Sequence, residues 1–362
     1  MSSSAGPPKI TSLRRFVLPG LFVLALFVAL VVRRPEATPV VPDTLELSGE
    51  IMGTTWGARI RGADASEGAA IHARIQSSLA EVDASMSTWK EDSEVSRFNR
   101  SQSTEPITLS PLLTEVLVAA LEVHTSSAGA FDVTVGPLVQ AWGFGSGALR
   151  TPPDPATLDA LKSRVGMGAL TLNEAARTIQ KSVGDRTLDL SAIAKGFAVD
   201  RASEALIAGG HPHFLLEVGG EVRVGGRGEG PPWRVAIEEP DLEGRRVREV
   251  LDMEHGALAT SGDYRQFRMH EGRVVSHAID PRTGEPVSNG VASVSVVAET
   301  AMEADAFATA FMVLGVEQSL DCAREKGLDV QLIVRSPDGT LSVQESPGFG
   351  RHRSGRAGGE AP

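Results

Sequence analysis

Cysteine is almost absent from this chain: it occurs once, as Cys322, among 362 residues. A single cysteine excludes an intramolecular disulfide and any metal site built from several thiolates. We expect Cys322 to pack as a small buried residue on a helix rather than to act as a nucleophile. A chain without disulfides suits the cytoplasm, and it equally suits a bacterial envelope protein that its core alone holds together.

Positive charge is also scarce. Lys and Arg number 35 against 46 Asp and Glu, which gives a net charge of −11. This balance argues against a nucleic-acid partner, because such proteins present a basic face. An anionic ligand such as a diphosphate would need local compensation from a metal ion or from a few Lys and Arg side chains. The hydrophobic share of 41% is ordinary, so a full core can form in one large domain or in two fused lobes.

Two familiar patterns are missing. No Gly-x-Gly-x-x-Gly segment follows a predicted strand and opens a helix, which argues against a Rossmann dinucleotide site. No internal repeat of about 20 to 50 residues is present, which argues against a solenoid or propeller. Predicted helices and strands are mixed without regular alternation, so the expected fold class is α+β, with a mostly antiparallel sheet and helices packed on it.

One long apolar run lies near the amino terminus. Basic residues at positions 9, 14 and 15 precede an uncharged stretch of 17 residues at 16–32, and two arginines and a proline follow it. The length is at the short end for a membrane span, and no clear cleavage site follows, so we expect an uncleaved transmembrane anchor. The flanking charge predicts a single-pass protein of the bacterial inner membrane, with residues 1–15 in the cytoplasm and the folded domain in the periplasm.

The remaining chain divides into a Pro-rich linker at 33–44, a folded domain at 45–346 and a disordered tail at 347–362. Apolar spacing and capping residues predict helices at 68–86, 110–125, 191–208 and 300–314, with a further helix around Cys322. Thr300 and Glu303 form a predicted capping box, and the Gly- and Pro-rich residues 142–155 predict a loop. The predicted strands are a pair within 45–60 broken at Met52, then 214–218, 221–224, 233–237, 273–277, 291–297, and a hairpin of 330–334 with 341–344.

The segment Asp189-Leu-Ser-Ala-Ile-Ala-Lys-Gly196 leads from an acidic residue into a helix predicted to start near Ser191. Free backbone N–H groups at such a start can bind phosphate, and Lys195 one turn later can meet the same anion. The Ala192 carbonyl has no large side chain to shield it from a hard cation. An amphipathic helix with a serine cap and a solvated lysine explains the same residues.

Asp305 and Thr309 are four residues apart on a predicted helix, so they share one face. A carboxylate and a hydroxyl suit Mg²⁺, which takes few protein ligands and keeps positions for phosphate oxygens. The alternative is purely structural, with an aspartate in the first helical turn and a threonine bonded back to the carbonyl four residues before it.

His277 ends a predicted strand, directly before the turn from Asp280 to Gly284. A histidine in this place can act as a general base or orient a hydroxyl. The alternative is a histidine whose ring bonds to the turn backbone. Three further segments contain side chains that can border a flat ring or pack in the core: Met52-Gly-Thr-Thr, Met86-Ser-Thr-Trp89 and Ala130-Phe-Asp-Val-Thr134.

Taken together, these segments resemble the FAD:protein FMN transferase family, the ApbE-like flavin transferases, and so imply an ApbE-like, T-fold-like arrangement. The matching segments run in the family's order from about residue 48 to 335. They are Met52–Thr54, Met86–Trp89, Asp92–Asn99, Phe131–Thr134, Asp189–Asp200, Glu217–Glu221, Thr260–Tyr264, His277–Gly284 and Ala304–Gly315.

The resemblance implies a Mg²⁺-dependent reaction that cleaves the diphosphate of FAD, transfers FMN to a threonine hydroxyl of a target flavoprotein and releases AMP. The implied metal ligands are the Ala192 carbonyl, Asp305 and Thr309. His277 matches the family's motif histidine, a candidate for activating the threonine, and Lys195 would offset charge on the phosphate oxygens. The implied FAD contacts are Met52, Trp89, Ala130, Phe131, Asp132, Asp189, Lys195 and Ile279.

This chain departs from the family's pattern in three ways. Trp89 stands where a tyrosine is common, Ala278 replaces a bulkier residue, and the lipid-modified cysteine of many exported members is absent, so the anchor must replace it. Two other interpretations stay open. One is a Mg²⁺-dependent FAD diphosphatase with water as the acceptor, and the other is a non-enzymatic, anchored FAD-binding protein.

Overall fold

The computed structural model describes residues 43–145, 152–241, 244, 246–264, 267–270 and 273–355. The anchor predicted at 16–32 and nearly all of the predicted linker lie outside these residues. Within the described ranges, no helix combines the length and the apolar character that a membrane crossing needs.

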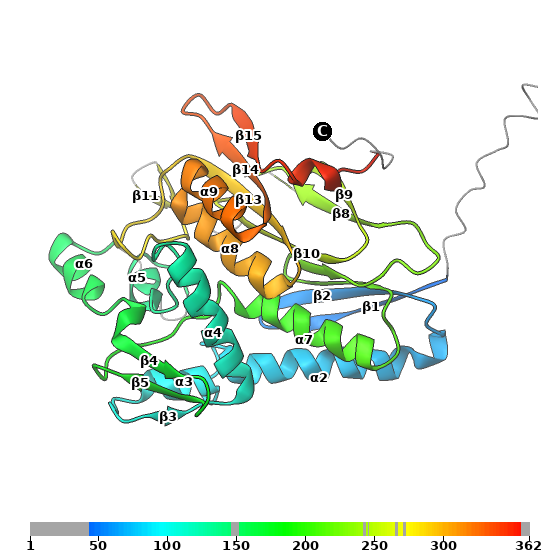
Figure 1. Ribbon diagram of the computed structural model, residues 1–362. Coiled ribbons are helices and arrows are strands. Elements are labelled where there is room, and N and C mark those ends of the chain that lie inside the picture. The colour runs from blue at the N-terminus through cyan, green and yellow to red at the C-terminus, as the bar shows by residue number, and fades with distance from the viewer. Residues whose placement is uncertain are drawn as a thin grey trace, which may run out of the picture. The chain divides into compact units, whose positions relative to one another are not determined.

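An eight-stranded sheet forms the centre of the domain, and every neighbouring pair of its strands is antiparallel (Figure 1). The α+β class with a mostly antiparallel sheet is therefore confirmed. In spatial order, the strands are β1 (Thr44–Ile51), β2 (Thr54–Arg61), β6 (Phe214–Val218), β7 (Glu221–Val224), β10 (Gly256–Gly262), β13 (Val291–Ala298), β14 (Asp329–Arg335) and β15 (Leu341–Glu345).

Helices cover one face of this sheet and bury the main core against it. They are α2 (Gly68–Met86), α4 (Pro111–Ser126), α7 (Ala194–Ala208), α8 (Ala301–Leu314) and α9 (Val316–Lys326). The predicted apolar spacing of α2 is confirmed, because Ile71, Ile75 and Leu79 are buried on one side of it. Cys322 is buried on α9, as expected. The other face carries a smaller core beneath the hairpin of β8 (Trp233–Glu238) and β9 (Val247–Met253).

A smaller layer lies beside the main sheet, and its elements were not predicted from the sequence. It contains the short strands β3 (Ile107–Thr108), β4 (Leu170–Asn173) and β5 (Thr178–Lys181), with the helices α3 (Glu94–Arg100), α5 (Gly136–Ala141) and α6 (Pro155–Lys162). The remaining elements are the hairpin of β11 (Phe267–His270) and β12 (Arg273–Ser276), and the 3₁₀ turns η1 (Ala65–Glu67), η2 (Met167–Ala169) and η3 (Phe349–His352).

Side-chain caps explain several of the helix starts. The Ser110 hydroxyl accepts a hydrogen bond from the Leu113 N–H at 3.1 Å, and Pro111 occupies the first turn of α4, as predicted. At α8, the Thr300 hydroxyl accepts from the Glu303 N–H at 3.2 Å, which is the threonine half of the predicted capping box.

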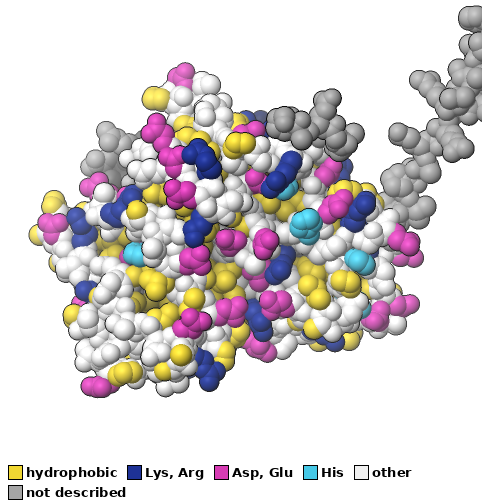
Figure 2. All heavy atoms as spheres, in the orientation of Figure 1, with side chains coloured by type: hydrophobic (Ala, Val, Ile, Leu, Met, Phe, Trp, Pro, Cys, Tyr) yellow, Lys and Arg dark blue, Asp and Glu magenta, His cyan; other side chains and the backbone are white. Residues whose placement is uncertain are grey.

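Charged side chains of both signs are mixed over the face shown in Figure 2. Some pair across elements, as Lys326 of α9 does with Glu122 of α4 at 2.9 Å. Such exposed pairs contribute little to stability, so burial of the two cores holds the fold together.

The prediction of a disordered tail from residue 347 is wrong for residues 349–354. Phe349 is fully buried, and the Ser354 N–H donates to the Val250 carbonyl at 2.9 Å. Asp329 on β14 accepts hydrogen bonds from Arg351 at 2.5 Å and His352 at 2.8 Å. The Gly and Arg residues of this segment had predicted disorder. Burial of Phe349 and the hydrogen bonds to the Asp329 carboxylate instead hold the segment against the sheet.

This docking should depend on pH. Burial raises the pKa of Asp329, but His352 and Arg351 more than offset that and hold the pKa below its usual range. The stabilisation is therefore present above the unfolded-state pKa of about 4 and is lost as the pH falls through the lower folded value. Asp329→Asn should reduce the free energy of unfolding by about 1–3 kcal/mol at pH 7, and the difference from wild type should shrink below pH 4. Urea denaturation at several pH values tests this, and an equal loss at pH 3 and pH 7 would contradict it.

Candidate active site

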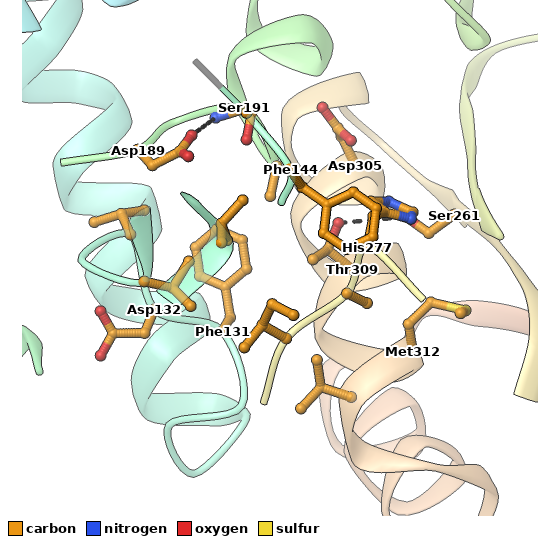
Figure 3. Close-up of a pocket in the computed structure, with 18 of the residues that line it drawn as sticks. Phe131, Asp132, Phe144, Asp189, Ser191, Ser261, His277, Asp305, Thr309 and Met312 are labelled. Carbon is orange, nitrogen blue, oxygen red and sulfur yellow. Dashed lines mark hydrogen bonds between the residues drawn. The ribbon is translucent and has the colours of Figure 1, made fainter. Parts of the chain in front are cut away.

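A cavity of about 360 Å³ opens between α7, α8 and the loops around them (Figure 3). Its polar end carries Ser191, Lys195, Asp305 and Thr309. Its apolar end is walled by side chains from α5, α8 and three loops: Phe131, Val139, Phe144, Ile279, Met312 and Val313. Segments more than 100 residues apart in sequence therefore meet around one space.

The close crossing of α7 and α8 builds the polar end. A Cβ on Gly196 would lie 2.1 Å from the Ala301 carbonyl oxygen and 2.8 Å from Asp305 Cβ, so only glycine fits there. The Gly196 N–H donates to Asp305 Oδ2 at 3.0 Å. Asp305 is only 3% exposed, and this bond fixes one of its oxygens.

Gly196→Ala should therefore be harmful, although alanine normally stabilises a helix relative to glycine by about 1 kcal/mol. The added methyl group would push α7 from α8, and we expect a loss of about 1–3 kcal/mol in the free energy of unfolding together with lower activity. Urea denaturation measures the first effect. Gly168→Ala is the matched control, because a Cβ there meets nothing within 4 Å. Equal stabilities for the two variants would refute the crowding argument.

A buried carboxylate on α7 sets the start of α8. Asp200 accepts hydrogen bonds from the N–H groups of Ala301 at 2.9 Å and Met302 at 2.8 Å, and from Arg223 at 2.7 Å. Burial raises the pKa of Asp200, although Arg223 and the two N–H groups favour its charged form. These bonds orient the first turn of α8 and so the face that bears Asp305.

Charged groups are crowded at the polar end. Lys195 Nζ lies 2.6 Å from Glu221 Oε1 and 3.7 Å from Asp305 Oδ1. The Ser261 and Thr309 hydroxyl oxygens are 3.3 Å apart (Figure 3). Among the described residues that line the cavity, Lys195 is the sole Lys or Arg, whereas four acidic residues belong to that lining: Asp132, Asp189, Glu221 and Asp305.

The structure gathers nearly all of the predicted site residues around this cavity. The predicted residues that line it are Trp89, Ala130, Phe131, Asp132, Asp189, Ala192, Lys195, His277, Ile279, Asp305 and Thr309. Met52 is the exception. It lies in the turn between β1 and β2 with a φ of 52°, and it packs partly against the main core. In the sequence, an apolar residue beside a turn could either border a ligand or pack in the core. In the structure, Met52 packs against the core.

Asp132 lines the cavity, but its carboxylate has a structural task. Oδ1 accepts from the Thr134 N–H at 2.7 Å, and Oδ2 accepts from the Met167 N–H at 3.2 Å. In Figure 3 the carboxylate points away from the cavity. We therefore expect the backbone of Asp132, rather than its carboxylate, to face a ligand.

The helix predicted to start near Ser191 begins three residues later, at Ala194. The expected free donors at this start are largely occupied. Ser191 N–H donates to Asp189 Oδ1 at 3.0 Å, and the Ile193 and Ala194 N–H groups both donate to the Leu190 carbonyl. Because this turn uses these backbone donors, Lys195 is the main group among the described lining residues that can compensate an anion at this end.

Sequence reasoning from single motifs missed several lining residues, and four of them bear on the chemistry of the site: Phe144, Glu221, Ser261 and Met312. Glu221 and Ser261 lie inside segments that carried the family resemblance, so those motifs were the available signal. No sequence signal pointed to Phe144, because it lies in a Gly-rich loop. Its ring meets His277 edge to face, with centroids 6.4 Å apart. Met312 follows Thr309 on the same face of α8, and helical spacing was its signal.

The polar end offers oxygen donors of the kind that a hard cation needs. Within the described residues, no cluster of three or more His, Cys, Asp or Glu side chains forms a metal site. Asp305, Thr309 and Ala192 nevertheless all line the cavity. One carboxylate, one hydroxyl and one carbonyl fit Mg²⁺, which retains waters or phosphate oxygens in its remaining positions.

Comparison with known proteins agrees with this arrangement. The model of the ApbE family matches residues 52–333. The FAD:protein FMN transferase of Klebsiella pneumoniae is 38% identical over 84% of this chain and 87% of its own length, and that of Escherichia coli K12 is 37% identical over 92% and 96%. The solved flavin transferase ApbE from Vibrio cholerae is 38% identical, with a TM-score of 0.77 over 86% of this chain and 99% of that one. The chain described here belongs to the ApbE family.

Proposed function

We propose that this protein transfers FMN from FAD to a threonine hydroxyl of a target flavoprotein through a phosphoester bond and releases AMP. One observation carries the proposal: a single cavity joins an apolar end suited to a flat ring to a polar end suited to a diphosphate. The names of its relatives, FAD:protein FMN transferases, support the same reaction.

The apolar end fits the isoalloxazine ring of FAD. Phe131, Ile279 and Met312 offer flat or flexible apolar surfaces around it. Trp89 lies at the mouth and is 73% exposed, which is too open for a core residue and leaves its ring available for stacking. Holding the ring here places the diphosphate beside Asp305 and Thr309.

The charges at the polar end argue for Mg²⁺. Lys195 already faces Glu221 and Asp305, so it cannot by itself offset the charge of a diphosphate among several carboxylates. We propose that Asp305, Thr309 and the Ala192 carbonyl hold Mg²⁺. When bound, the ion would stabilise the charge that develops on the phosphate oxygens. Glu221 keeps the Lys195 ammonium at the same end.

His277 is the proposed base for the incoming threonine. Its imidazole lines the cavity, and the Phe144 ring packs against it at the boundary between the polar and apolar ends (Figure 3). A neutral imidazole can take the hydroxyl proton as the oxygen attacks the phosphorus of the FMN half. The P–O bond to the AMP half then breaks, and AMP leaves.

The reaction is tested by mixing the protein, FAD and Mg²⁺ with and without a target domain that bears an acceptor threonine. We expect AMP together with flavin that stays on the target after denaturation. Free FMN and AMP formed equally well without a target would instead identify a diphosphatase. FAD binding without AMP release would identify a flavin-binding protein.

We further propose that residues 16–32 anchor the chain in the bacterial inner membrane, with the catalytic domain in the periplasm. The basic residues before the apolar run support this orientation. Protease treatment of spheroplasts tests it: the domain should be digested without breaking the inner membrane. Protection of the domain until lysis would contradict the orientation.

A further inference from the structure

A second cavity of about 500 Å³ adjoins the reaction cavity, and we name it the side groove. It runs between α3, α5, α6 and the segment that leads into α7. Thr88 and Asp189 line both spaces, so the two share a wall. The other residues used in the argument are Glu91, Asn99, Arg100, Gln140 and Arg164.

Asp189, one residue of the shared wall, lies at the polar end of the reaction cavity. Asp189 Oδ1 accepts from the Ser191 N–H at 3.0 Å, and Ser191 and Ala192 both line that end (Figure 3). A molecule seated in the side groove therefore approaches the region assigned to the diphosphate rather than the ring.

One wall of the side groove is fixed in position. The Asn99 side chain donates to the Leu188 carbonyl at 2.8 Å and accepts from the Leu188 N–H at 2.7 Å. Arg100 and Gln140, in contrast, are exposed, and within the described part of the chain neither side chain has a hydrogen bond or ion pair. A guanidinium and an amide are thus presented on a rigid surface.

The chemistry of the side groove fits a polypeptide better than a nucleotide. No aromatic side chain belongs to its described lining, so it offers no stacking surface for a base. Its charges are balanced, with Glu91 and Asp189 opposite Arg100 and Arg164, so it does not attract a phosphate strongly. Amide, guanidinium and hydroxyl groups match the N–H and C=O groups of an extended chain.

We propose that the side groove binds the acceptor polypeptide of the target flavoprotein and directs its threonine to the reaction cavity. Arg100 and Gln140 would bind backbone carbonyls or polar side chains of that segment. This inference rests on the proposed function and adds the surface that selects the protein substrate.

The probe is a library of synthetic twelve-residue peptides with a threonine fixed at the centre, incubated with the full chain, FAD and Mg²⁺. Arg100→Glu and Gln140→Ala should each lower the rate of FMN attachment about tenfold at low peptide concentration. Mass spectrometry of the peptides measures this rate. The Kd for FAD, measured by flavin fluorescence, should stay within about twofold, because neither residue lines the reaction cavity. Arg324→Glu on α9 is the control for a lost exposed arginine.

Every outcome decides the proposal. Slower attachment with unchanged FAD affinity supports it. Unchanged attachment in both variants overturns it, and a parallel loss of FAD affinity overturns it too, by making the groove part of the FAD site. If the wild-type protein labels a target domain but no peptide, this inference fails and the proposed function stands. If it labels neither and only releases free FMN, the proposed function fails and this inference fails with it.

Discussion

Asp305→Asn is expected to lower the rate of FMN transfer by about a thousandfold or more. That factor corresponds to roughly 4 kcal/mol, a size typical of losing the charge that a catalytic cation needs. The amide has nearly the shape of the carboxylate, and its oxygen can still accept the N–H of Gly196, which lies 3.0 Å from Asp305 Oδ2. Folding should therefore survive, with a melting temperature close to wild type.

Steady-state kinetics with saturating FAD and Mg²⁺ measures this loss, and circular dichroism checks the fold. Glu303→Gln is the matched control, because it removes a carboxylate from the same helix outside the cavity lining. Activity within threefold of wild type in Asp305→Asn would remove Asp305 from the proposed metal site. A comparable loss in the Glu303 variant would point to general charge effects instead.

His277→Ala should lower kcat for FMN transfer by about 10²–10⁴-fold, the usual contribution of a general base. FAD affinity should change only a few-fold, because the apolar walls and the polar end stay in place. Rapid mixing with an acceptor domain gives the transfer rate, and flavin fluorescence gives the Kd. His211→Ala, a histidine outside the cavity lining, controls for the loss of an imidazole.

An unchanged kcat in His277→Ala would exclude this residue as the base. A large rise in the Kd for FAD with unchanged kcat would also contradict the assignment, since it would make His277 a binding residue. The two readouts together separate the roles, because a base acts on the transfer step and not on the initial complex.

The main helices and most strands of the sheet were predictable because large apolar residues recur at regular spacing. α2 shows this best, with its stripe from Ile71 to Met86. β10 was missed, although it lies near the middle of the sheet. Its sequence from Gly256 to Gly262 has mostly small residues, because α8 packs directly on it and leaves little room. Small residues carry no clear strand pattern, so sequence alone does not reveal such a strand.

The site shows a different limit. Asp305 and Thr309 follow from helical spacing, but the contact of Asp305 with Gly196 joins residues 109 positions apart. The prediction that the segments of Asp305 and Gly196 form one site came from the family resemblance and not from any local sequence pattern. The Ser191 N–H bonds to Asp189, and the Asp132 carboxylate bonds to the backbone of Thr134. Both contacts depend on turn geometry, which the spacing of residues in the sequence did not predict.

A crystal structure of this protein with FAD and Mg²⁺ would test most directly whether substrate and cation meet where α7 crosses α8. We predict the ring of FAD at the apolar end, and the cation bound by Asp305 and Thr309 with oxygens of the diphosphate completing its shell. A diphosphate bound outside this cavity, or a cation that touches neither side chain, would contradict the account.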